Sequence, residues 1–406
     1  MSVGLKLPTS ILPINGIRLS TCCANLYKKK RTDLTLIEFA EGSNVAAVFT
    51  KNLFCAAPVQ IAKQHLTEYK PRYCLINAGN ANAGTGEQGL LDSSITCKAL
   101  ANATGCKEGE VLPFSTGVIG EVLPVDKINT VLPELVENLS ANSWLDAAKA
   151  IMTTDTIPKA VSKTISLGES AISITGVVKG SGMIRPNMAT MLAFIATDAN
   201  IRKDMLEKIL LHAVNKSFNR ITVDGDTSTN DSCVLIATGK ARHKCIDDQS
   251  SEEYAILENA LTSVFCELSQ AVIRDGEGAS KFLTIKVTGG KQQSECIDVA
   301  YKIAESPLVK TAFTASDANW GRILSAIGNS GINDLDINNI EVFLDNICIV
   351  ENGQRAASYT EEKGSMVMLQ DEIKLTVNLK RGEHQEVIWT TDLSHEYIKI
   401  NAEYRT

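Results

Sequence analysis

Residues 179–196 place a threonine hydroxyl where a self-activating nucleophile needs one. Their sequence, KGSGMIRPNMATMLAFIA, begins as a loop rich in glycine and proline and continues as an apolar strand whose first residue is Thr190. Cleavage between Ala189 and Thr190 would free an α-amine on the residue that carries the hydroxyl, and that amine could serve as general base. A β-branched residue in a strand also has a purely structural explanation, so this pattern alone does not decide between the two.

The sequence STGVIG at residues 115–120 combines small residues with hydroxyl and N–H donors. Acyl transfer needs such donors aimed at the oxyanion that forms on the attacked carbonyl, so this segment is a candidate oxyanion hole. The alternative interpretation is a tight turn after Pro113.

A glycine-rich segment at residues 77–89 raises the question of nucleotide binding. It contains GxGxxG at Gly84, Gly86 and Gly89, but residues 77–83 separate the first glycine from the preceding strand. In addition, no acidic strand end follows ~20 residues later, as a dinucleotide-binding turn requires. A loop that lines a small-molecule pocket is therefore the better interpretation.

Residues 220–231, RITVDGDTSTND, place Asp224 and Asp226 after an apolar strand. This layout resembles the nucleophile loop of haloacid-dehalogenase phosphatases, which depend on Mg²⁺. A calcium loop does not fit, because Thr229 stands where glycine is required and Leu235 stands where a bidentate glutamate belongs. An Asx-rich turn, whose side chains satisfy the backbone, is the structural alternative.

Composition and charge favour small metabolites as partners. Of the 406 residues, 44% are hydrophobic and 21% are charged, as in a typical globular protein. The 40 Lys and Arg against 47 Asp and Glu give a net charge of −7, so we expect no nucleic-acid partner. The basic run at residues 28–31 is short and is interpreted as a solvated turn.

Cysteine, histidine and terminal patterns point to a cytoplasmic protein without a metal site. The eleven cysteines include no CxxC pair, which indicates reduced thiols, and the five histidines show no HxxxH spacing. The N-terminal segment is interrupted by proline and glycine where a signal peptide would be apolar. No apolar run reaches the ~18 residues needed to cross a bilayer, so we expect no membrane insertion.

Hydrophobic patterning predicts the elements that hold these motifs. Short strands at both ends of the chain, with helices between them, indicate an α+β or layered α/β fold. Strands are expected at residues 46–50, 72–79, 282–290, 340–350, 372–380 and 386–391, and helical spacing occurs at 90–105, 132–152, 201–218 (with Asp198 as N-cap) and 251–274.

Five ordered segments carry a family resemblance: KGSGMIRPNMATML, ITVDGDTSTNDS, RDGEGASK, SDANWGRI and the terminal NAEYRT. Together they resemble the glutamate N-acetyltransferase (ornithine acetyltransferase) family of arginine biosynthesis. The resemblance extends from the strand at residue 46 to the last residue. It implies a self-cleaving enzyme of the N-terminal-nucleophile type, with a mixed-sheet sandwich flanked by helices and a smaller C-terminal domain.

The resemblance also implies roles for individual residues. Cleavage would give an N-terminal chain, residues 1–189, and a C-terminal chain, residues 190–406, which begins with the nucleophile Thr190. Thr116 and Gly117 would form the oxyanion hole. The substrate-contacting positions would be Thr153, Lys179, Thr190, Glu277, Asn401 and Thr406.

The reaction implied by the resemblance moves an acetyl group from N-acetylornithine to glutamate through acetyl-Thr190, without a metal or bound cofactor. Acetyl-CoA would be a second donor in a bifunctional enzyme, and the cleaved chains would pair as an α2β2 heterotetramer. Three alternatives remain open at this point. They are a self-cleaving aminopeptidase or amidohydrolase with the same nucleophile, a phosphatase centred on Asp224 and Asp226, and a non-catalytic binding protein.

Overall fold

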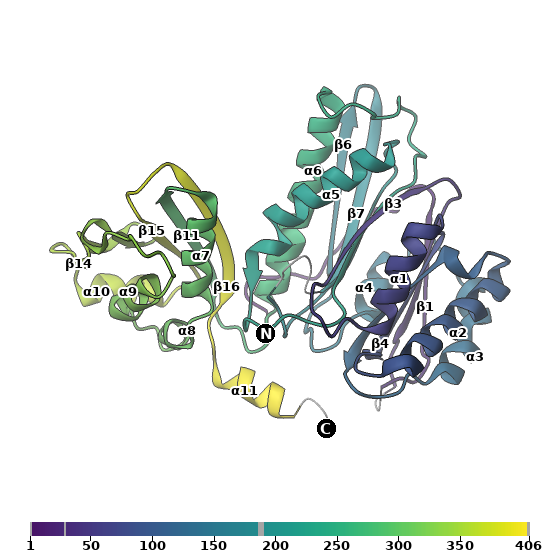
Figure 1. Ribbon diagram of the computed structural model, residues 1–406, viewed down its shortest axis with the longest axis horizontal. Helices are drawn as coiled ribbons and strands as arrows, with labels where there is room; N and C mark the ends of the chain where they lie inside the picture. Colours follow the sequence, from purple (N-terminus) through teal and green to yellow (C-terminus); the bar gives the residue numbers. More distant parts are fainter. Residues whose placement is uncertain (1, 28–29, 186–190, 404–406) are drawn as a thin grey trace.

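The computed structural model describes residues 2–27, 30–185 and 191–403, and two packed β-sheets form its larger part (Figure 1). The strand order is β1-β2-β4-β5 in one sheet and β3-β10-β8-β7-β6 in the other. Apolar side chains of both sheets meet in the interior between them. The first sheet contains β1 (Ile17–Cys22), β2 (Leu34–Phe39), β4 (Tyr73–Asn80) and β5 (Val111–Val118), and the second contains β3 (Asn44–Phe49), β6 (Lys159–Leu167), β7 (Ser170–Lys179), β8 (Leu192–Thr197) and β10 (Ser232–Ala237).

Strand β8 illustrates how the sequence produces these layers. All 6 residues of the strand, LAFIAT, are buried. Because side chains alternate along a strand, Leu192 and Phe194 point between the sheets, whereas Ile195 points to the opposite face. That face is covered by α5 (Lys203–Lys216) and α6 (Glu252–Arg274), which explains the uninterrupted apolar run.

Helices also cover the outer face of the first sheet, so the order of layers is helix, sheet, sheet, helix (Figure 1). These outer helices are α2 (Gly86–Thr104) and α3 (Val125–Glu137). Between the layers, α1 (Ala57–Glu68) packs beside β5, and α4 (Trp144–Ala150) buries its first residue between the sheets.

Two of the predicted elements are wrong in detail. Residues 132–152 are not one helix, because the chain between α3 and α4 pairs with β1. Backbone hydrogen bonds of 2.8 and 2.9 Å join Ser140 to Leu19 and take the place of helical bonds. Asp198 is not the N-cap of α5, because its carboxylate accepts the Ser173 N–H at 2.9 Å instead.

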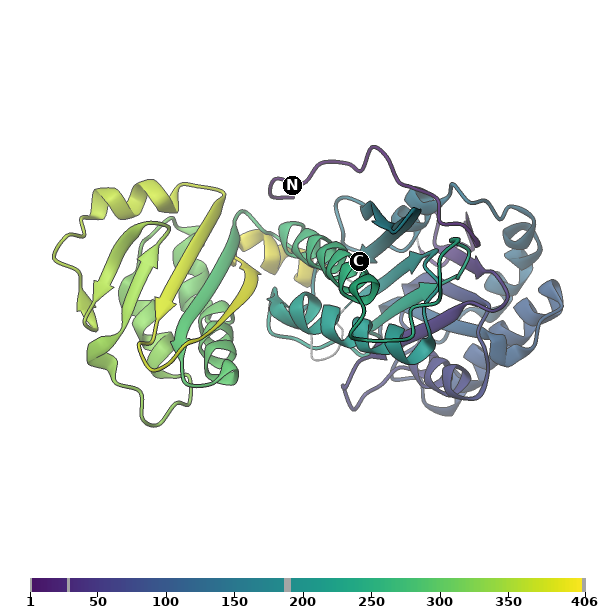
Figure 2. The same cartoon turned by 90° about the horizontal axis from the view of Figure 1, so that it is seen from above.

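The C-terminal part of the chain forms a separate, smaller domain (Figure 2). Its described residues form a 7-stranded sheet in the order β14-β13-β12-β15-β11-β16-β9, in which the short strand β9 comes from the larger part of the molecule. Apolar side chains from this sheet and its helices form a core of their own. The strands are β9 (Ile221–Thr222), β11 (Phe282–Gly290), β12 (Glu341–Leu344), β13 (Ile347–Glu351), β14 (Gln354–Arg355), β15 (Glu372–Asn378) and β16 (His384–Thr391), and the helices are α7 (Gln293–Ala304), α8 (Pro307–Thr314), α9 (Trp320–Gly328) and α10 (Glu361–Met368).

The predicted fold class is therefore confirmed: an α+β protein with packed sheets, flanking helices and a smaller C-terminal domain. The strands predicted in the C-terminal third are confirmed as well, except that residues 340–350 divide into the hairpin of β12 and β13. The division of the chain at residues 189 and 190 stays a prediction.

Helix α11 (His395–Ala402) follows the C-terminal domain and lies between the two parts of the molecule (Figures 1 and 2). The Ser394 hydroxyl donates to the Gly278 carbonyl at 2.7 Å, and the Tyr397 hydroxyl donates to Asp224 Oδ2 at 3.2 Å. Gly278 has a φ of +68°, and a Cβ there would lie 2.4 Å from the Tyr397 nitrogen. This close approach holds the first turn of α11 against the larger part of the molecule.

Lys310 of α8 is a buried cation in the C-terminal domain. Its ammonium donates to Thr390 Oγ1 at 3.0 Å and to the Thr391 carbonyl. Burial lowers the pKa of Lys310 from 10.5 to about 8, although nearby carboxylates, Asp392 first among them, oppose the shift.

This lowered pKa predicts a pH-dependent contribution to stability. Between pH 8 and 10.5 the unfolded chain keeps the Lys310 proton and the folded chain loses it, so the contribution of Lys310 to stability improves as pH rises through that interval. The change over the whole interval is roughly 3 kcal/mol. Chemical denaturation at pH 7 and pH 10 should show wild type gaining most of this amount relative to Lys310→Met. Equal gains in both proteins would contradict the prediction.

Candidate active site

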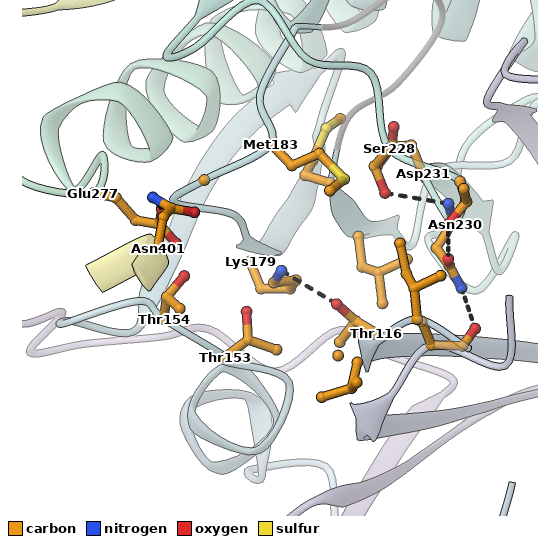
Figure 3. A pocket seen from close by; sticks show the side chains of 18 residues that line it. Thr116, Thr153, Thr154, Lys179, Met183, Ser228, Asn230, Asp231, Glu277 and Asn401 are labelled. Atoms are coloured by element: carbon orange, nitrogen blue, oxygen red, sulfur yellow. Dashed lines mark hydrogen bonds between the residues drawn. The ribbon is translucent and has the colours of Figure 1, made fainter. Parts of the chain in front are cut away.

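A cavity of about 260 Å³ lies where β5 and β7 end and β8 and β10 begin (Figure 3). The turn after α6 and the helix α11 complete its wall. The cavity thus collects residues from segments that are far apart in the sequence. Those among the predicted site residues that line it are Thr116, Gly117, Thr153, Lys179, Glu277 and Asn401.

Three of the predicted site residues, Ala189, Thr190 and Thr406, lie outside the described residues. Met191, which follows Thr190 in the sequence, lines the cavity. The roles of the three residues therefore stay predictions.

Thr116 and Gly117 lie near the end of β5, so the tight turn suggested for residues 115–120 is wrong for this part of the segment. The pairing of β5 with β4 shifts register at Gly79 and Asn80. Gly117 has a φ of +132°, and a Cβ there would lie only 2.3 Å from the Gly79 carbonyl carbon. An irregular strand end of this kind takes backbone groups out of the ladder, and here it faces the cavity.

Lys179 is the last residue of β7, and its ammonium points toward Thr116 (Figure 3). Nζ donates to Thr116 Oγ1 at 3.2 Å. Because the Thr116 oxygen accepts this bond, its own proton is available to an acceptor in the cavity. Loss of hydration lowers the pKa of Lys179, and the carboxylates of Asp155, Asp231 and Glu277 counteract part of that effect.

A buried ion cluster of Asp155, Lys159 and Asp275 lies next to the cavity. Lys159 Nζ donates to Asp155 Oδ1 and to Asp275 Oδ2, each at 2.6 Å, and no side chain of the cluster is more than 1% exposed. Asp155 also accepts the N–H groups of Thr153, at 2.9 Å, and Gly180, at 2.8 Å. Burial alone would raise the pKa of Asp155, but the Lys159 ammonium holds it below its ordinary value.

The ion cluster also reaches the turn that carries Glu277. The Ser181 hydroxyl donates to the Asp275 carbonyl at 2.6 Å, and the Ser181 carbonyl accepts the Glu277 N–H at 3.0 Å. The loop with Thr153, the end of β7 and the turn after α6 therefore share one set of buried hydrogen bonds. This set fixes where the predicted substrate contacts lie relative to one another.

Sequence reasoning missed the ion cluster and the cavity residue Asp231. The spacing of Asp155 and Lys159, four residues apart along the chain, was the local signal that could have drawn attention to them. Asp275 stands 116 residues from Lys159, and nothing local links the two.

Glu277 occupies the part of the cavity nearest α11. Its side chain is buried, and Asn401 Nδ2 donates to Oε2 at 2.8 Å. Gly182, in the loop after β7, provides the space for this carboxylate, because a Cβ there would lie 2.3 Å from Glu277 Oε2. The position of the carboxylate thus depends on glycine at residue 182.

Gly182→Ala should displace the Glu277 carboxylate without disturbing the fold, because the displaced atoms end a flexible side chain. We expect the KM of a substrate with a distal ammonium to rise about tenfold, within the ~1–3 kcal/mol typical of a hydrogen bond to a charged group. Steady-state kinetics and the melting temperature measure the two effects. Gly328→Ala in α9, where a Cβ would meet nothing within 4 Å, is the control. An unchanged KM in Gly182→Ala would contradict this account.

Asp224 supports a turn. Its carboxylate accepts the N–H groups of Met183, at 2.7 Å, and Ile184, at 3.0 Å, in addition to the Tyr397 hydroxyl. Within the described part of the chain, neither Asp224 nor Asp226 lines the cavity. These contacts favour the structural Asx turn over the phosphatase interpretation.

The glycine-rich segment does not form a dinucleotide-binding turn. Gly86 and Gly89 lie within α2, and the Asn82 side chain donates to the Gly89 carbonyl and to Ser93 Oγ, each at 2.9 Å. From this segment, Ala81 lines the cavity. The pocket-lining interpretation is therefore correct for the beginning of the loop.

The eleven cysteines are all free thiols. Across the described ranges, the helices are too short or too polar to cross a membrane.

Fold and site together fit a class of protein: an enzyme whose cavity offers an ammonium, a carboxylate and a threonine hydroxyl to a small charged molecule. The comparison with known families then identifies it more closely. The model of the ArgJ family matches residues 18–406, so the chain belongs to the ArgJ family. This confirms the family predicted from the sequence motifs, and with it a transferase of arginine biosynthesis.

The curated relatives agree with the family model. The chain is 53% identical to the arginine biosynthesis bifunctional protein ArgJ of Pseudomonas fluorescens and 53% identical to that of Psychrobacter arcticus, over 100% of each chain. A solved ArgJ structure from Bacillus halodurans is 38% identical, covers 50% of this chain and 95% of its own, and has a TM-score of 0.48. The ornithine acetyltransferase of Mycobacterium tuberculosis, solved with ornithine, is 33% identical, covers 44% of this chain and 94% of its own, and has a TM-score of 0.39.

Proposed function

We propose that the cavity is the active site of a glutamate N-acetyltransferase that works through an acetyl-Thr190 intermediate. The enzyme takes the acetyl group from N-acetylornithine, releases ornithine, and passes the acetyl group to glutamate. The observation that carries this proposal is that Lys179 and Glu277, which carry opposite charges, line the same cavity. Thr116 and Gly117 line it as well. Membership of the ArgJ family supports the same reaction.

In the first half-reaction the Thr190 hydroxyl attacks the acetyl carbonyl, and the α-amine freed by self-cleavage accepts the hydroxyl proton. The carbonyl oxygen becomes negative and is stabilised by donors at Thr116 and Gly117. The Lys179 ammonium beside the Thr116 hydroxyl supports this role, because it occupies the acceptor side of that oxygen. In the second half-reaction the glutamate amine attacks the carbonyl of acetyl-Thr190, and the Thr190 oxygen leaves and recovers its proton.

The two substrates share an α-carboxylate and differ in the charge of the distal group, and the cavity has a residue suited to each of these groups. Lys179 suits the α-carboxylate of either amino acid, and Glu277 suits the distal ammonium of ornithine. Glutamate carries a distal carboxylate instead, which would face Glu277. The Asn401 amide beside Glu277 can present either its NH₂ or its oxygen, so it suits both distal groups. Thr153 and Thr406 are proposed as further substrate contacts.

The proposed cleavage leaves the two chains in one sheet. Strand β7 would belong to the N-terminal chain and β8 to the C-terminal chain, yet they pair in antiparallel fashion from Ile174 to Lys179. Strand β8 in turn pairs with β10 of its own chain, and β10 pairs with β3 of the N-terminal chain. These pairings support a cleaved enzyme that stays assembled, and we propose the α2β2 heterotetramer as its form.

The same scheme uses no metal or bound cofactor. The curated relatives carry the description "bifunctional", and we propose acetyl-CoA as the second acetyl donor. We also propose the cytoplasm as the site of action, in keeping with free thiols and small-molecule substrates.

Self-cleavage is tested by mass spectrometry of active protein. Under denaturing conditions we expect fragments of about 20 and about 23 kDa, whereas native conditions should keep them in one complex. Thr190→Ala should abolish both cleavage and acetyl transfer. Active protein that consists of intact chain alone would refute the proposed nucleophile. Acetyl-ester hydrolysis that is as fast without glutamate as with it would favour the hydrolase alternative.

Asn401→Ala tests the accommodation of both distal groups. We expect self-cleavage to proceed normally. For N-acetylornithine and for glutamate we expect kcat/KM to fall, each by an amount equivalent to ~1–3 kcal/mol of transition-state stabilisation. Ile398→Ala is a matched control, since Ile398 lies on the same helix and is 65% exposed. Deletion of residues 401–406 should act in the same direction. If both Asn401→Ala and the truncated chain kept the wild-type kcat/KM, the C-terminal residues 401–406 would take no part in substrate binding.

A further inference from the structure

A second cavity, of about 660 Å³, lies at the end of the two packed sheets opposite to the candidate active site. Its lining comes from the first parts of β1 and β7 and from the segments that precede β4 and follow β8. Strand β8 runs from one cavity to the other, and its 6 residues span roughly 20 Å. One small molecule therefore cannot occupy both cavities.

Two charged side chains enter this cavity from opposite sheets. Because side chains alternate along an extended chain, Arg72 points to the same side as Cys74 of β4, and Asp198 points to the same side as Ala196 of β8. Cys74 and Ala196 both belong to the core between the sheets. Packed sheets lie about 10 Å apart, so the guanidinium and the carboxylate face each other across the opening of the cavity.

Arg72 supplies a cation without a counter-charge. Its Nε is buried without a hydrogen-bond partner, and its guanidinium forms no ion pair within the described part of the chain. Buried donors are satisfied in the great majority of native proteins, by the protein itself, by water or by a ligand. A guanidinium offers two parallel N–H groups to a carboxylate, so Arg72 is suited to hold one in the cavity.

Asp198 supplies the opposite charge. Its side chain is buried, and Oδ1 accepts the Ser173 N–H at 2.9 Å, but no cationic side chain pairs with it among the described residues. Burial raises the pKa of Asp198, and a bound cation would stabilise its ionised form. The other charged residues of the described lining, Arg18 and Glu38, already pair with each other at 2.5 Å.

We propose that this cavity is a second binding site, which takes a basic α-amino acid. The carboxylate of the ligand binds Arg72, and its distal cationic group binds Asp198. Its aliphatic chain lies on the apolar side chains that line the cavity, which include Ile14, Ile17 and Phe39. Since the site is separate from the proposed active site, the inference does not depend on the proposed function.

Isothermal titration of the full-length enzyme with three compounds tests which groups are recognised. L-Lysine carries both charges at the two ends of its chain, L-norleucine lacks the distal ammonium, and cadaverine lacks the carboxylate. We expect L-lysine to bind about tenfold or more tightly than either of the others, because each of these leaves one buried charge unpaired. Absence of L-lysine binding, or equal affinity for L-lysine and L-norleucine, would overturn the inference.

Substitutions decide whether L-lysine binds at this cavity or at the active site. Arg72→Met and Asp198→Asn should each raise the Kd of L-lysine about tenfold or more. Arg202→Met is the matched control, because Arg202 is an exposed arginine outside the described lining, and it should leave the Kd unchanged. L-Lysine held only in the active site would bind all three variants as it binds wild type, and that result would refute the second site.

A measurement on wild type covers the case in which Arg72→Met and Asp198→Asn do not fold. Hydrogen exchange followed by mass spectrometry should show slower exchange at residues 13–18 when L-lysine is added, because this segment forms one wall of the cavity. L-Norleucine at the same concentration should have little effect there. Unchanged exchange at residues 13–18 with saturating L-lysine would overturn the inference.

Discussion

Two buried aspartates that share one lysine hold the site together. The Lys159 ammonium lies 2.6 Å from a carboxylate oxygen of Asp155 and 2.6 Å from one of Asp275. All three side chains are buried away from water, where an unpaired charge is costly. The cluster carries one excess negative charge, and the nearby Lys179 ammonium offsets it, as its effect on the pKa of Asp155 indicates. The separation between Lys179 and Glu277 is therefore set by the protein before any substrate enters. Preorganisation of this kind spares the reaction the work of arranging charges at the moment of transfer.

Local patterns predicted the elements well where local forces decide the structure. The apolar repeat at residues 251–274 became α6, and residues 282–290 became β11 with the expected bounds. The predictions failed where a distant segment competes for backbone hydrogen bonds. Ser140 pairs with Leu19 and so interrupts the helix expected over residues 132–152. No local propensity encodes a partner so far away in the sequence.

The site shows the same limit in its side chains. Thr116 and Lys179 were found because each lies in a distinctive motif, yet their contact joins residues 63 apart. Asp155 and Asp231 were passed over, since a single aspartate in a polar segment looks like a turn residue. Their importance comes from burial, which depends on the packing of both sheets and of α6 and is invisible to residue type and spacing.

Because the two proposed chains share one sheet, the proposed cleavage changes how folding depends on protein concentration. In the uncut chain the β7–β8 pairing closes a loop within one molecule, so its formation does not depend on protein concentration. After the proposed cut, the same pairing joins two molecules, and recovery from complete unfolding becomes a second-order process. The melting temperature then acquires a concentration dependence that the precursor lacks. A mature enzyme of this design relies on slow unfolding for its persistence, because reassembly in dilute solution is disfavoured.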